Sequence, residues 1–87
     1  MSISLNEFYR LLPIALKDYT YNVKNDKISF NYKSGSIRID ITKKTERKIA
    51  SLVLPVIHIS FEFSNVRTDS IDQFMSEFSQ AYLRGGG

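Results

Sequence analysis

Apolar and polar residues alternate along four segments of this chain, and a period of two is typical of half-buried β-strands. The segments are residues 19–24, 28–32, 37–42 and the second half, 57–63, of the apolar run 52–63. The third is the most regular, because Ile37, Ile39 and Ile41 alternate with polar residues. The pattern therefore predicts four strands, each with one apolar side.

Two further segments carry apolar residues at helical spacing. In the first, Ser4 and Glu7 have the form of a capping box, so a helix is expected to begin there. Pro13 falls inside this helix, and we expect a kink there or a helix that ends near Leu12. The second segment begins at residues 68–70 and ends near Arg84, with its apolar stripe at Ile71, Phe74, Met75, Phe78, Ala81 and Tyr82.

These elements predict the fold class α+β, in the order α-β-β-β-β-α. Because every strand has one apolar side, we expect a four-stranded antiparallel sheet with both helices packed on one face. Turns are expected at residues 24–27 and 33–36, with Gly35 at positive φ. Residues 43–51 read as a polar connection, which lets the fourth strand either continue the meander or cross to the other edge. Residues 1–84 would form a single domain, followed by a flexible glycine tail at residues 85–87.

The fourth predicted strand differs from the others because its first half is apolar on both sides. Leu54 and Val56 fall on the side that His58 and Ser60 leave open to water. An apolar patch there needs cover, so we predict a protein interface at Leu54, Val56, His58 and Ser60. The partner would be another protein or a second copy, as in a homodimer. Alternatively, the connection at residues 43–51 folds back and seals the patch.

The charges are unevenly distributed along the chain, although the net charge is only +3. Residues 24–48 hold eight bases and three acids, while residues 62–77 hold four acids and one base. The basic region suggests an alternative function, the binding of nucleic acid or another polyanion. Against it, the aromatic residues fall on the side that the helices should cover, whereas single-stranded nucleic acids need exposed ones for stacking. The bases of this alternative site are Lys27, Lys33, Arg38, Lys43, Lys44, Arg47 and Lys48.

The residue types limit the chemistry that can be expected. The chain has no cysteine and one histidine, and it carries no phosphate-binding glycine loop or zinc-ligand spacing. His58, Ser60, Arg38 and Asp40 could be neighbours on the open face, but a flat face makes a poor catalytic pocket. We therefore expect no enzyme activity, no cofactor and no metal. The absence of a signal peptide and of a long apolar run favours a cytoplasmic protein without membrane contact.

Two features of the chain, the order of its elements and its last residues, resemble known families. The order of elements resembles that of a double-stranded-RNA-binding domain, which would imply duplex RNA as a partner. That family has a basic cluster at the start of its final helix, where this chain has Asp69 and Asp72. Leu83-Arg84-Gly85-Gly86 resembles the tail of ubiquitin, but a conjugable tail would end at Gly86, and this chain continues to Gly87. Neither resemblance assigns the chain to a family.

Overall fold

The first helix begins where its capping residue predicts. The computed structural model describes the backbone of residues 1–86 and the side chains of residues 1–83. In it, the Glu7 amide donates a hydrogen bond to Ser4 Oγ at 3.1 Å. The Glu7 carboxylate does not return to the cap but pairs with Arg10. The helix then continues through Pro13 to Ala15 instead of ending near Leu12. Pro13 lies in the last turn, where its missing N–H removes only one hydrogen bond.

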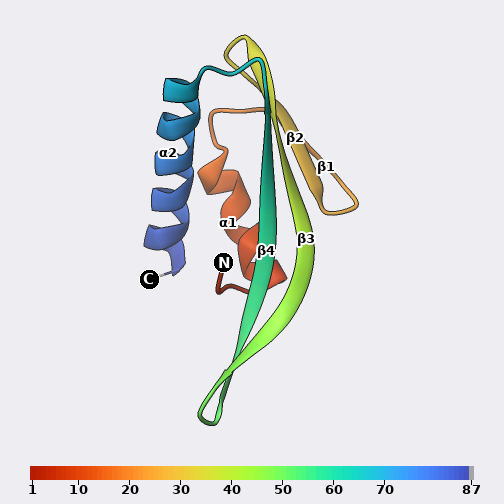
Figure 1. The fold of residues 1–87 in the computed structure, drawn as a ribbon, viewed down its shortest axis with the longest axis vertical. Helices are drawn as coiled ribbons and strands as arrows, with labels where there is room; N and C mark the ends of the chain where they lie inside the picture. Colours follow the sequence, from red (N-terminus) through yellow and green to blue (C-terminus); the bar gives the residue numbers. More distant parts are fainter. Residues whose placement is uncertain (87) are drawn as a thin grey trace.

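The order of elements is the predicted α-β-β-β-β-α (Figure 1). The sheet is an antiparallel meander of order β1-β2-β3-β4, so the fourth strand continues the meander and lies at an edge. The last helix ends at Gly86, two residues after Arg84, and Gly87 of the predicted tail lies outside the described residues. The elements are α1 (Leu5–Ala15), β1 (Tyr21–Lys24), β2 (Lys27–Tyr32), β3 (Gly35–Ile49), β4 (Leu52–Ser64) and α2 (Thr68–Gly86).

Both tight turns of the meander form, but Gly35 has a different role from the predicted one. Asn25 and Asp26 have φ values of 51° and 60°, as a two-residue hairpin turn requires. In the second turn Lys33 takes the positive φ, at 53°, and Gly35 does not. A Cβ atom on Gly35 would instead collide with the carbonyl groups of Ser64 and Asn65. Glycine at position 35 therefore allows the segment that leads from β4 to α2 to pass close to β3.

Both helices cover the same face of the sheet, as predicted (Figure 1). The buried core combines side chains from the inner face of the sheet with those from the helix stripes. Tyr82 of α2 also donates to the Phe8 carbonyl of α1 at 2.9 Å, which joins the two helices. The buried apolar residues are Phe8, Leu11, Leu12, Leu16, Ile28, Phe30, Tyr32, Ile37, Ile39, Ile57, Phe74, Phe78 and Tyr82.

The prediction of a polar connection at residues 43–51 is wrong for most of this segment. Residues 43–49 belong to β3, and only a tight turn at residues 50–51 separates β3 from β4. The pairing shifts by one residue between Ile41 and Lys43, which makes Thr42 a β-bulge. We call residues 42–58 the arm. It extends beyond the ends of both helices (Figure 1), and the molecule measures 47 × 26 × 21 Å.

Candidate functional site: the arm and the open face of the sheet

The arm is basic along one strand and mainly apolar along the other. On one of its faces Thr45 lies opposite Val56 and Arg47 lies opposite Leu54. On the other face, Lys48 lies opposite Val53. This division follows from the register alone, because β3 supplies Lys and Arg where β4 supplies Leu and Val. Each face of the arm therefore presents two bases of β3, separated by Thr45 on one face and by Glu46 on the other, beside mainly apolar side chains of β4.

The predicted patch lies at the centre of this ribbon. Leu54 and Val56 are half-buried, and they share the side of β4 that His58 and Ser60 occupy, opposite the helices. The segment that could have folded back over the patch instead pairs with β4 edge to edge, so it does not cover either face.

Three further apolar side chains are exposed at the end of the arm. Leu52 is 62% exposed, Val53 51% and Ile49 46%. We did not predict these as interface residues, although the loss of alternation between Leu52 and Ile57 was the signal that could have indicated them. The apolar surface of the arm therefore extends from Val56 to its tip.

The base of the arm is fixed to the rest of the molecule through Asp26. Tyr9 Oη donates to Asp26 Oδ1 at 2.8 Å, and Lys44 Nζ lies 3.0 Å from Asp26 Oδ2. The hydrogen bond from Tyr9 and the contact with Lys44 lower the pKa of the Asp26 carboxyl. Burial and the bond to Asp26 raise the pKa of Tyr9 to about 12. A helix, a turn and the arm thus meet at one carboxylate.

The N-terminal residue holds the free edge of β4 at the same level. The Met1 amino group donates to the Ile57 carbonyl and the Ile57 amide donates to the Met1 carbonyl, each at 2.9 Å. Ile57 therefore directs its backbone N–H and C=O groups away from β3. Backbone groups alternate in direction along a strand, so those of Pro55, two residues earlier, also point away from β3. The N–H that Pro55 lacks thus falls on the free edge, where proline is tolerated.

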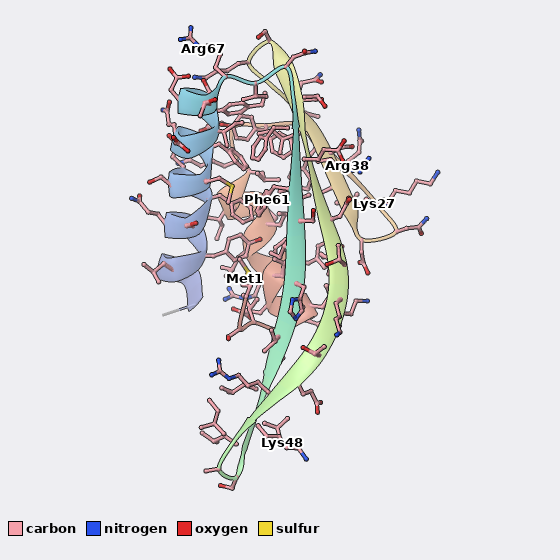
Figure 2. All side chains as sticks on the ribbon, in the orientation of Figure 1. Met1, Lys27, Arg38, Lys48, Phe61 and Arg67 are labelled. Carbon is pink, nitrogen blue, oxygen red and sulfur yellow. The ribbon has the colours of Figure 1, made fainter. Side chains whose placement is uncertain are left out.

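The open face of the sheet carries a network of ion pairs. Arg38 lies 2.6 Å from Glu62 and 3.3 Å from Asp40, while Lys27 lies 3.9 Å from Asp40 (Figure 2). Among the described residues, no side-chain hydrogen bond joins His58 or Ser60 to this network. Beside Arg38 the face has a hollow of about 300 Å³ that opens to solvent. Of the four residues considered for catalysis, Arg38 and Asp40 are therefore joined by ion pairs, whereas the side chains of His58 and Ser60 are not connected to them.

The seven predicted polyanion-binding bases fall into two groups. Lys27, Arg38 and Lys44 lie beside carboxylates, and Lys33 lies 3.3 Å from Ser70 Oγ and over the ring of Tyr32. In the part of the chain with described side chains, the remaining three make no ion pair. All three belong to the β3 strand of the arm, and Figure 2 labels Lys48 near its tip. These three are Lys43, Arg47 and Lys48.

Within residues 1–83 no group of three or more acidic or histidine side chains is arranged to hold a metal ion. Neither helix, as far as it is described, has the length and apolar character needed to cross a membrane. Comparison with protein-family models, curated proteins and solved structures finds no match to this chain. The fold and the arm therefore define its class, a small α+β protein with a projecting two-stranded ribbon.

Proposed function

We propose that this chain is a non-enzymatic protein-interaction module, and that the arm with the adjoining open face of the sheet is its binding surface. A two-stranded ribbon is only marginally stable in water unless it packs against something. Here neither helix covers the distal arm, and Leu52 and Val53 are more than half exposed. A protein partner would bury these side chains and stabilise the ribbon. This exposed apolar surface is the observation that carries the proposal.

The proposed interface includes Leu54, Val56, His58 and Ser60, with Arg47 beside the apolar row. Arginine and large apolar residues are frequent at the centres of protein interfaces. Such a module would act by presenting its arm to a partner. We place it in the cytoplasm, where proteins rarely carry disulfides, because this chain has no cysteine.

Photo-cross-linking in cells tests the proposal. A photo-reactive amino acid at position 52 is expected to give a cross-linked product that contains a second polypeptide. The same group at Val23, which is 48% exposed on β1 and away from the arm, serves as the matched control. Introducing Leu54→Lys into the position-52 chain should remove the product while the circular dichroism spectrum stays the same. No polypeptide product from position 52 would contradict the proposal.

The arm bases support a second candidate, the binding of a polyanion, because Lys43, Arg47 and Lys48 are not neutralised by an ion pair within the described side chains. If this is the function, replacing all three by Gln should weaken heparin binding and reduce its dependence on salt. The matched control is Lys27→Gln with Lys33→Gln, away from the arm. Equal binding by both variants would exclude the arm as the polyanion site.

A further inference from the structure

A groove runs along the outer side of the helix pair, far from the open face of the sheet. Leu11, Ile14 and Ala15 of α1 and Ala81 of α2 line it, and it encloses about 560 Å³. Ile14 is 59% exposed, although it belongs to the helix that supplies much of the core. The helix pair therefore leaves an apolar concave surface open to a partner.

The surroundings of this groove are acidic. Asp18 and Glu77 lie at its sides with one base, Lys17. The sequence of α2 holds three acids (Asp69, Asp72 and Glu77) and one base, Arg84, so its net charge is negative. A partner that fits this site should therefore combine an apolar ridge with positive charge.

The arm has both of these properties. Residues 42–58 include four bases and one acid, and the tip exposes Ile49, Leu52 and Val53. The arm cannot enter the groove of its own chain, because it extends away from the helices (Figure 1). Any contact between the two surfaces must therefore join two molecules.

We infer that the arm of one copy of this chain docks in the groove between α1 and α2 of a second copy. The inference rests on the proposed function and names its partner. The tip enters the groove with its two faces toward the two helices: Ile49, Leu52 and Arg47 are on one face, and Val53 and Lys48 are on the other. The aliphatic side chains then lie against Ile14 and Ala81, and each base reaches one of the two acids, Asp18 and Glu77. A single such contact leaves one arm and one groove free, and these are filled either by the reciprocal contact of the same pair or by further copies in a head-to-tail chain.

Two single substitutions test this arrangement by sedimentation velocity. Val53→Glu on the arm and Ile14→Lys in the groove each replace an exposed apolar side chain with a charge of the wrong sign. The wild-type chain is expected to self-associate, more weakly at high salt, and each variant should weaken association by about tenfold or more, which corresponds to about 1.4 kcal/mol or more. Val23→Lys is the matched control: Val23 is 48% exposed on β1, away from both surfaces, and its variant should associate like the wild type.

Mixing the two variants provides the decisive measurement. The Ile14→Lys chain keeps an intact arm and the Val53→Glu chain keeps an intact groove, so an equimolar mixture should form a one-to-one complex. A symmetric interface between identical surfaces would not be restored in this way. If circular dichroism shows that either variant is misfolded, Leu52→Glu and Gln80→Lys take their places, since both positions are exposed.

Two outcomes would overturn the inference: a wild-type chain that stays monomeric up to millimolar concentration, or two weakened variants whose mixture forms no complex. The cross-linking experiment separates this failure from failure of the proposed function. A monomeric chain that still cross-links from position 52 to a different polypeptide overturns self-docking alone. A chain that gives no polypeptide product from position 52 overturns both.

Discussion

At the scale of single residues, Gly35 and Asp26 each hold together segments that are distant in the sequence. Gly35 leaves room for the Ser64 and Asn65 carbonyls beside β3. Asp26 lies in the β1–β2 turn, but its carboxylate binds Tyr9 of α1 and Lys44 of the arm. Neither role follows from the short stretch of sequence around the residue.

We expect Gly35→Ala to destabilise the fold by about 1–3 kcal/mol, because the added methyl group meets backbone that cannot easily move. Urea unfolding would measure the change. Ser36→Ala is the matched control, since Ser36 is the next residue of β3 and is exposed. Equal unfolding midpoints for the two variants would show that the connection can shift without cost.

Asp26→Asn should lower the free energy of unfolding at neutral pH by about 0.5–1 kcal/mol, because the ion pair with Lys44 is lost. Since the pKa of Asp26 is lowered in the folded state, its contribution is present above the unfolded pKa of about 4 and disappears as the pH falls through the folded value. The difference between wild type and variant should therefore shrink on acidification. Urea titrations at neutral and acidic pH would measure it, with Asp72→Asn on exposed α2 as the control; a difference that grows in acid would contradict the assignment.

At the scale of elements, the arm combines two regions of different stability. Its base is fixed by Asp26 and by the pairing of Met1 with Ile57. Beyond that level the two strands bond only to each other, and no helix covers them. The bulge at Thr42 separates the sheet proper from this ribbon and sets which β3 side chains share a face with Leu54 and Val56.

We expect hydrogen exchange to reveal this division. In dilute solution, amides of the distal arm at residues 45–55 should exchange faster than those at residues 37–40, because the latter share the buried core. Occupation of the arm by a partner should slow the exchange of the distal amides and leave residues 37–40 unchanged. Equal protection of the two regions in the free monomer would mean that the arm unfolds only with the whole domain.

At the scale of the whole molecule, one apolar layer holds the sheet and the helices together. Two tyrosines beside this layer add hydrogen bonds between elements. Tyr9 binds Asp26 at the base of the arm, and Tyr82 joins α2 to α1 through the Phe8 carbonyl. Burial raises the pKa of both hydroxyls, that of Tyr9 to about 12. Both groups therefore favour the folded state while they remain protonated.

Alkaline pH should consequently unfold the molecule. A tyrosine whose pKa is raised on folding contributes its full stability below the unfolded value of about 10 and loses it as the pH rises through the folded value. Thermal unfolding followed by circular dichroism should show a falling midpoint above about pH 10. Tyr82→Phe should reduce this slope and cost about 1 kcal/mol at neutral pH. A slope unchanged by Tyr82→Phe would rule out a contribution from this hydroxyl.

The sequence alone determined the fold class, the two helices and the apolar side that each strand turns toward the helices, because side-chain periodicity reports directly on burial. It also indicated Leu54 and Val56, since two apolar residues interrupt a polar side. It did not indicate that residues 43–49 are a strand: Lys and Glu have low strand propensity, and pairing with the apolar segment 52–58 overrides it. Only the tertiary structure decided that Asp26 fixes the arm, that Gly35 permits a close approach and that a groove lies between the helices. Each of these depends on residues distant in the chain, which local patterns do not encode.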